Sequence, residues 1–234
     1  IIHKGNILKS EIYKEGYLTI QDQSSMLVAE MLDLNKGMTV LDACSAPGGK
    51  TTHIAEKMAD SGKIHAYDLH EKKAKLVSKK ALELNLTIVD AKQADSRKLN
   101  EIHEEETFDR IVLDAPCSGL GVLRGKPDIK YHKKENDIEQ LATIQAELLE
   151  SVSYLLKKDG KLLYSTCTVD KNENEKVIEK FLKEHQNYEI DQDFYNELPK
   201  PLQGTPGISQ FGLQIYPQDF NTDGFFLTRL IKKK

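Results

Sequence analysis

The stretch Met38-Thr-Val-Leu-Asp-Ala-Cys-Ser-Ala-Pro-Gly-Gly-Lys-Thr51 decides how the fold can be read. Thr39 to Leu41 form a short apolar β-type run, Pro47 and the Gly48-Gly49 pair form a loop, and a helical pattern follows. Adjacent glycines let backbone N–H groups approach a ligand, and the free N–H groups of the next helix favour an anionic or electron-rich partner. The stretch therefore predicts a strand, a tight turn and a helix N-terminus that together bind a nucleotide-like cofactor.

The residues of this loop exclude two common nucleotide-binding patterns. A phosphate-binding P-loop needs a glycine where this chain has Cys44, and the dinucleotide pattern G-x-G-x-x-G is absent. Asp42 at the end of the strand, followed by the Ala-Pro-Gly-Gly turn, is instead similar to the first motif of S-adenosylmethionine (SAM) methyltransferases. On this loop alone, the alternative is a chance Gly-Gly turn in another α/β protein.

Length and composition limit the class of protein. The 234 residues suit one large domain, and the net charge of −4 argues against tight unaided binding to nucleic acid while leaving room for a local basic patch. Three cysteines without close-paired spacing predict neither a disulfide framework nor a zinc site, and they indicate a reducing cytoplasm. No apolar run suits a membrane span, no signal peptide is visible, and the start at Ile1 suggests a fragment of a longer protein.

The periodicity of apolar residues places the remaining elements around this loop. Residues 1–20 alternate loosely and predict short strands or an extended segment, which we separate as an appendage from a domain over residues 21–234. Gln21 to Ser25 offer capping side chains for a helix that ends before the first strand. Further predictions are helices over Asp137–Leu156 and residues 171–185, a flexible Pro- and Gly-rich excursion over Leu198–Gly212 near the rim of the site, and a last strand over Phe225–Ile231 that runs antiparallel at the far end of the sheet.

Two further carboxylates follow predicted strands. Asp68 closes the strand Ile64–Asp68, about twenty residues after the glycine turn, where a carboxylate can accept the ribose hydroxyls of an adenosine. The alternative for Asp68 is an ordinary cap of the next helix. Asp95 follows a third strand over Thr87–Ala91 and is within reach of an adenine edge.

Two cysteines end a matched pair of strands. Phe108 to Leu113 lead into Asp114-Ala-Pro-Cys-Ser-Gly119, and Gly160 to Tyr164 lead into Ser165-Thr-Cys-Thr168. A crossover helix between such strands makes a right-handed parallel unit whose strand ends lie about 5 Å apart. We therefore expect Cys117 and Cys167 to meet at the carboxyl edge of the sheet, beside the cofactor loop. For either cysteine alone, a small buried apolar role is the alternative.

Two thiols and a carboxylate beside a methyl donor suit methylation of cytosine at carbon 5. A thiolate that adds to carbon 6 makes carbon 5 nucleophilic, and a carboxyl group at ring N3 assists this addition. After methyl transfer, a base removes the proton from carbon 5 so that the thiol can leave.

These motifs, together with Asp223-Gly-Phe-Phe226 near the end of the chain, resemble the RNA (cytosine-5) methyltransferases, most closely those that act on bacterial 16S ribosomal RNA. The resemblance implies a Rossmann-like α/β domain with a seven-stranded, mostly parallel sheet and a preceding NusB-like RNA-binding domain. It also implies that Cys167 is the covalent nucleophile, that Cys117 assists product release and that Asp114 contacts the cytosine. The residues that it implies for SAM are Cys44, Ser45, Ala46, Pro47, Gly48, Gly49, Lys50, Asp68, Asp95 and Asp114.

The resemblance also indicates the partner. We expect a cytoplasmic monomer that acts on ribosomal RNA of the small subunit before full assembly, without a metal and away from membranes. Transfer RNA as the substrate, or a non-catalytic assembly factor that binds SAM and RNA, are the alternatives. One dense basic stretch follows Cys117 and is read as a phosphate-contacting loop, with a plain solvated loop as the alternative: Arg124, Lys126, Lys130, Tyr131, His132, Lys133 and Lys134.

Overall fold

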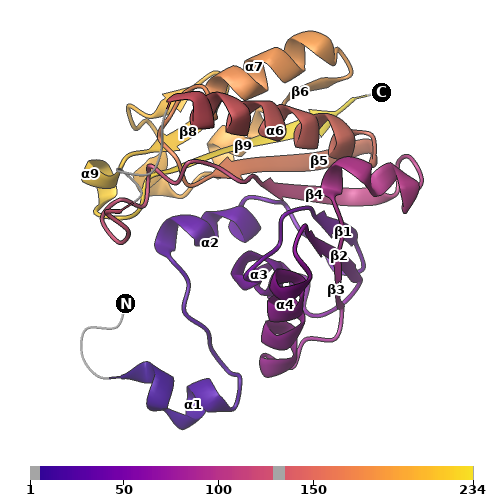
Figure 1. The fold of residues 1–234 in the computed structure, drawn as a ribbon, viewed down its shortest axis with the longest axis vertical. Coiled ribbons are helices and arrows are strands. Elements are labelled where there is room, and N and C mark those ends of the chain that lie inside the picture. The colour runs from indigo at the N-terminus through magenta and orange to yellow at the C-terminus, as the bar shows by residue number, and fades with distance from the viewer. Residues whose placement is uncertain (1–5, 129–134, 234) are drawn as a thin grey trace.

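One mixed β-sheet runs through the residues that the computed structural model describes, 6–128 and 135–233 (Figure 1). Its strands lie in the order β3-β2-β1-β4-β5-β9-β8-β7, and β6 also pairs with β9. The bounds are β1 Thr39–Asp42, β2 Lys63–Asp68, β3 Val89–Gln93, β4 Phe108–Asp114, β5 Leu156–Thr166, β6 Tyr188–Ile190, β7 Ile208–Ser209, β8 Gly212–Ile215 and β9 Phe225–Lys232.

The first five strands are parallel, and β9 runs antiparallel to β5. This confirms the expected α/β class and the direction of the last strand. Within residues 6–128 and 135–233 the sheet has nine strands, where seven were expected. The three residues of β6 and the two of β7 are too short to show a period of two in the sequence. β6 and β8 both pair with β9 and place it inside the sheet, so its expected position at the far end was wrong.

Helices cover both faces of the sheet (Figure 1). In this view α2 (Gln23–Glu30) lies below β5 and β9, α3 (Gly49–Lys57) and α4 (Glu71–Glu83) lie to the left of β1 to β3, and α6 (Glu135–Ser153) and α7 (Glu175–Glu184) lie toward the top of the molecule. Strand residues alternate between the two apolar layers: Leu41, Ile111 and Leu162 belong to the layer of α6 and α7, whereas Val40, Val112 and Leu163 belong to the layer of α2 and α3. The shorter elements are η1 Ile7–Lys9, α1 Glu11–Lys14, η2 Ser96–Glu101, α8 Asp193–Glu197, η3 Lys200–Leu202 and α9 Pro217–Phe220.

The N-terminal segment differs from the expectation of short strands. Residues 7–14 form the short helices η1 and α1, which stand apart from the rest of the chain in Figure 1. Gly16 brings this segment against α4, since a Cβ at Gly16 would lie 1.9 Å from the carbonyl oxygen of Glu83. The capping prediction for α2 is confirmed, because the Asp22 carboxylate accepts the Ser24 N–H at 2.9 Å.

The excursion predicted over Leu198–Gly212 is more ordered than its Pro and Gly content suggested. Leu198 and Leu202 are buried in the apolar layer that also holds Phe194 and Leu213. Two apolar anchors thus tie this segment to the core, which corrects the expectation of a flexible loop. None of the helices in the described ranges combines the length and the apolar character that a bilayer span requires.

Candidate active site

The carboxyl ends of β1, β4 and β5 meet at one edge of the sheet. The register pairs Asp42 with Val112 and Asp114 with Ser165, so the loops that follow these strands start side by side. A cavity of about 430 Å³ lies at this edge. Its lining includes most of the predicted site residues: Cys44, Ala46, Asp68, Asp95, Asp114, Cys117 and Cys167.

The two thiols meet in this cavity. Cys117 Sγ and Cys167 Sγ lie 3.3 Å apart, within hydrogen-bonding distance, which confirms that the two strand ends converge. The hydrogen bond between them, together with burial, raises the pKa of Cys117. The same hydrogen bond lowers the pKa of Cys167; burial and Asp114 oppose this change and Lys50 supports it. The opposite directions of these shifts make Cys167 the more acidic thiol of the pair.

A lysine from the glycine loop holds the carboxylate of the first cysteine motif. Lys50 Nζ lies 2.7 Å from Asp114 Oδ2, and Ser165 Oγ donates to Asp114 Oδ1 at 2.8 Å. Burial alone would lower the pKa of Lys50, but the charge of Asp114 and its hydrogen bond raise it. Asp114 is thus fixed by two partners at the rim of the cavity, with Cys167 close enough to feel both charges.

The glycine loop is shaped by close contacts on one side and open space on the other. Gly48 has a φ of +105°, and a Cβ there would lie 3.0 Å from Val77 Cα, so glycine is required for both reasons. At Gly49, which begins α3, a Cβ would meet no described atom within 4 Å. The open side faces a second hollow of about 190 Å³ that Cys44, Ser45, Ala46, Pro47, Gly49, Lys50 and Asp114 help to line.

Asp42 is buried beneath this loop, and the half-buried Cys44 lines both hollows. Thr51 Oγ1 donates to Asp42 Oδ2 at 2.6 Å, and burial raises the pKa of Asp42 to about 7. Burial and the charges of Asp42 and Asp114 raise the pKa of the Cys44 thiol. These opposite shifts make the Cys44 thiol less acidic than that of Cys167.

The two predicted nucleotide-binding carboxylates differ in how far other residues of the chain already occupy their oxygen atoms. Asp68 lies at the end of β2, lines the larger cavity and accepts the His70 N–H through Oδ1 at 3.1 Å. Asp95 lines the same cavity, but both of its oxygens accept hydrogen bonds from Arg97, the shortest at 2.8 Å, and these bonds lower its pKa. Asp68 suits a diol, whereas the carboxylate of Asp95 is largely occupied by Arg97.

The segment before α2 also reaches the site, which sequence reasoning did not assign to it. Ile20, Gln21 and Ser25 line the smaller hollow with Lys50 and Asp114. The Gln21 amide nitrogen is buried and has no hydrogen-bond partner among the described residues. Residues on both sides of the expected boundary at residue 20 therefore contribute to this hollow.

Sequence reasoning also missed a buried polar network behind the cysteines. Gln145, Glu173 and Asn174 are fully buried and bond to the two loops that carry Cys117 and Cys167. In the sequence, Asn172 to Glu175 look like an ordinary polar start of a helix, and no signal distinguishes Glu173 from its neighbours.

Other charged groups lie outside this site. Of the basic stretch, Arg124 and Lys126 are described, and Lys130 to Lys134 lie outside the described residues. Glu150, Glu184 and His185 bring ligand-type atoms within 4.8 Å of one another. His185 Nε2 already lies 2.7 Å from Glu150, and both glutamates are exposed, so a surface ion pair accounts for this group.

The chain is similar to a known family over most of its length. The family model described as "16S rRNA methyltransferase RsmB/F" matches residues 29–231. A curated relative from Bacillus subtilis, named probable ribosomal RNA small subunit methyltransferase B, is 48% identical over 230 residues. The match covers 98% of this chain and 51% of that protein, so the chain spans about half the length of this relative.

Solved structures share the fold. NSun6 from Pyrococcus horikoshii, solved with SFG, has a TM-score of 0.86 and 29% identity, over 99% of this chain and 57% of the other. A methyltransferase homologue from the same organism has a TM-score of 0.81 and 31% identity, over 98% of this chain and 72% of the other. The second match covers more than two thirds of a chain that is over 30% identical, so the likeness extends beyond a shared fold.

Proposed function

The chain belongs to the RsmB/F family of 16S rRNA methyltransferases, and from this membership we propose that it methylates carbon 5 of a cytosine in 16S ribosomal RNA with SAM as the methyl donor. The observation that carries the proposal is the distance of 3.3 Å between Cys117 Sγ and Cys167 Sγ in a cavity that Asp68 also lines. Two thiols in one cavity suit covalent attack on a pyrimidine and release of the product, and methyl transfer to an oxygen or an amino group needs neither.

The residues around the cavity fit SAM. Asp68 offers a carboxylate for two hydroxyl groups, the Gly48-Gly49 turn exposes backbone N–H groups at the start of α3, and the cavity of about 430 Å³ suits a nucleoside. Lys50 and the buried Asp42 lie beneath the loop where charged groups of the cofactor would be held. When bound, SAM supplies an electrophilic methyl group.

In the proposed mechanism, the chain supplies the nucleophile, a group for the ring and a base. The Cys167 thiolate forms a bond to carbon 6 of a cytosine splayed out of its stack, and the electrons of the double bond move to carbon 5. Asp114, held by Lys50 and Ser165, accepts the N–H of a cytosine ring protonated at N3. After carbon 5 is methylated, Cys117, its own proton first given up to solvent, accepts the proton from carbon 5; the electrons of that C–H bond form the double bond again, and the bond from carbon 6 to Cys167 breaks to leave a thiolate.

Family membership also supports proposals on the domains, the RNA contacts and the cellular setting of the protein. We propose that residues 1–20 belong to an RNA-recognition appendage and residues 21–234 to the catalytic domain, and that Arg124 and Lys126 contact RNA phosphates. The protein acts as a monomer in the cytoplasm on small-subunit RNA before full assembly. Transfer RNA and a non-catalytic assembly role remain outcomes of the test below.

The test uses the protein, labelled SAM and unmodified 16S ribosomal RNA or transfer RNA, followed by nucleoside analysis. We expect label in 5-methylcytidine from 16S RNA. Label in uridine or adenosine would exclude the cytosine assignment, label in transfer RNA alone would replace the substrate, and RNA binding without any methyl transfer would favour the assembly factor.

Two single substitutions test the roles of the thiols. Cys167→Ala removes the nucleophile and is expected to abolish methyl transfer. Cys117→Ala leaves attack and methylation intact but slows release, so a covalent complex of RNA and protein should accumulate and remain visible on a denaturing gel. Cys44→Ala is the matched control and should form no such complex, because the raised pKa of the Cys44 thiol keeps it protonated at neutral pH. A complex formed by Cys167→Ala and not by Cys117→Ala would reverse the two assignments.

A further inference from the structure

Two neighbouring residues ahead of α7, Glu173 and Asn174, are each 0% exposed and reach opposite cysteine loops. Neither carries chemistry in the mechanism proposed above. A carboxyl group and an amide buried this deeply need hydrogen-bond partners, and the partners that they have define what they do.

Glu173 holds the residues on both sides of Cys117. Its Oε1 accepts the Ser118 N–H at 2.8 Å and Gln145 Nε2 at 3.0 Å, and its Oε2 accepts Ser118 Oγ at 2.6 Å. Gln145 also donates to the Pro116 carbonyl oxygen at 2.9 Å. Glu173 and Gln145 therefore fix the backbone immediately before and after Cys117.

Asn174 does the same for Cys167. Its Oδ1 accepts Thr166 Oγ1 at 2.5 Å, and its Nδ2 donates to the Thr168 carbonyl oxygen at 3.1 Å. Ser118 Oγ and Thr168 Oγ1, 2.8 Å apart, join the two loops directly. One dipeptide thus contacts the residues that flank both sulfur atoms.

These hydrogen-bond partners of Glu173 are neutral groups, which makes its burial costly. An aliphatic residue of similar size would fill the same space without a polar group to desolvate. Such a residue could not accept hydrogen bonds from the Ser118 N–H and hydroxyl groups. These two bonds determine where Cys117 lies relative to Cys167.

We propose that Glu173 and Asn174 are positioning residues that set the separation of the Cys117 and Cys167 sulfur atoms, so that one can attack and the other can assist release. The expected effect on turnover rests on the methyltransferase function proposed above. The expected effect on the contact between the two sulfur atoms does not rest on that function, because this contact can be measured without RNA.

The first measurement is the rate of alkylation of each cysteine by iodoacetamide as a function of pH, resolved by mass spectrometry of the peptides. Iodoacetamide reacts with the thiolate, so the profile reports the hydrogen bond between the sulfurs. In Glu173→Ala we expect the alkylation profile of Cys167 to move to higher pH, because Cys117 is displaced and its hydrogen bond with the Cys167 sulfur is lost. The Cys44 profile is the internal control and should stay where it is.

The second measurement is turnover with labelled SAM and 16S RNA. A displacement of about 1 Å in a reacting group costs about 100-fold, so we expect Glu173→Ala to lose between about 10- and 100-fold. It should also accumulate the covalent complex expected of Cys117→Ala. A variant that is only unstable would lose activity without trapping RNA, which separates positioning from a purely structural role.

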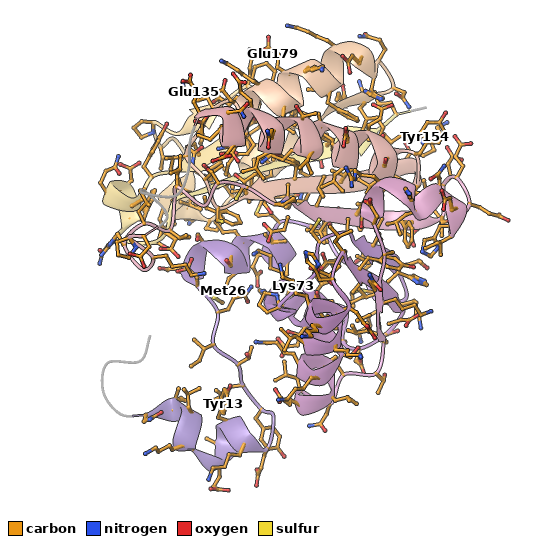
Figure 2. The ribbon with its side chains drawn as sticks, in the orientation of Figure 1. Tyr13, Met26, Lys73, Glu135, Tyr154 and Glu179 are labelled. Atoms are coloured by element: carbon orange, nitrogen blue, oxygen red, sulfur yellow. The ribbon has the colours of Figure 1, made fainter. Side chains whose placement is uncertain are left out.

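Conservative and distant variants complete the test. Glu173→Gln keeps an acceptor for the Ser118 N–H, and its amide can donate to Ser118 Oγ, so it should restore both readouts to near the parent. Glu179→Gln makes the same chemical change on the outer side of α7, where Glu179 pairs with Lys183 at 2.9 Å, and should change neither readout (Figure 2).

A folded Glu173→Ala protein with parental alkylation profiles for both cysteines would overturn the proposal. If that variant does not fold, Ser118→Ala tests the same link, since it removes only the hydroxyl between Glu173 and Thr168. Should the parent not methylate RNA at all, the function proposed above fails, and the alkylation profiles still decide the positioning role.

Discussion

At the scale of single residues, Lys50 is the cation that the Cys167 thiol feels most directly. It pairs with Asp114 at 2.7 Å and lowers the pKa of Cys167. We expect Lys50→Met to move the iodoacetamide profile of Cys167 to higher pH by about half a unit to one unit. Lys57→Met on the same helix, where Lys57 pairs with Glu30 at 2.9 Å, is the control. A Cys167 profile that Lys50→Met leaves in place would remove Lys50 from the electrostatics of the thiol.

Asp42 gives a second prediction, on the pH dependence of stability. Burial raises its pKa from 3.8 to about 7, so the unfolded chain releases this proton at lower pH than the folded protein does. The free energy of unfolding therefore falls as pH rises from about 4 to about 7 and stays lower above this window. Asp42→Asn removes this dependence and should gain about 2 to 4 kcal/mol over the parent as pH is raised from about 5 to about 8. Urea unfolding at several pH values measures it.

Asp60 provides a control of opposite sign. Although burial opposes the shift, hydrogen bonds from Thr87 and Ile88 lower the pKa of Asp60. Its contribution to stability is present above its ordinary pKa and is lost as pH falls through the lowered value. Asp60→Asn should therefore be less stable than the parent at neutral pH, and the difference should shrink in acid. An Asp42→Asn curve parallel to that of the parent would contradict the assignment of Asp42.

At the scale of elements, β9 is tied to its surroundings through the buried Arg229. Arg229 Nε donates to Asp191 at 2.7 Å, and Nη1 donates to the Met31 carbonyl oxygen and to Glu197, each at 2.8 Å. These bonds join β9 to the end of α2 and to α8. Arg229→Met leaves the buried Asp191 with less compensation and should lower the free energy of unfolding by about 3 to 5 kcal/mol.

Denaturant unfolding of Arg229→Met beside Lys183→Met checks this expectation. Lys183 pairs with Glu179 on the exposed side of α7, so its substitution should leave stability close to that of the parent. Equal midpoints for the two variants would show that the bonds of Arg229 contribute nothing net to stability.

At the scale of the whole molecule, the N-terminal segment depends on Gly16 for its contact with α4. Gly16 has a φ of +79°, and a Cβ would lie 1.9 Å from the Glu83 carbonyl oxygen. We expect Gly16→Ala to release residues 7–19 while the sheet stays folded. Trypsin should then cleave after Lys9 and Lys14 about tenfold faster. This factor corresponds to a loss of about 1.4 kcal/mol in the free energy that holds the segment against α4.

Gly37→Ala is the matched control for this experiment. Gly37 has nearly the same φ, +81°, but a Cβ there meets no described atom within 4 Å. It carries the same backbone strain without the clash, so trypsin should cleave the segment at the parental rate. Equal cleavage of the two variants would mean that the close approach of Gly16 to α4 does not hold the segment in place.

The sequence by itself determined the strand, turn and helix around Gly48 and the pairing of the two cysteine motifs. These features depend on local backbone chemistry and on the rule that parallel strands end at one edge. It predicted the helices over 135–153 and 175–184 to within a few residues, because their apolar periodicity is strong.

Only the tertiary structure decided which neutral groups surround Glu173, that Arg97 bridges Asp95 and Glu147, and that the short strands β6, β7 and β8 extend the sheet beyond β9. The deciding contacts join residues far apart in the chain: Gln145 meets Glu173 across 28 positions, Arg97 meets Glu147 across 50 positions, and β6 gains strand geometry by pairing with β9. Hydrogen bonds across such separations produce no periodic pattern in the sequence. A glutamate has the same identity in the sequence whether its carboxyl group is buried or exposed, so the sequence does not distinguish the two cases.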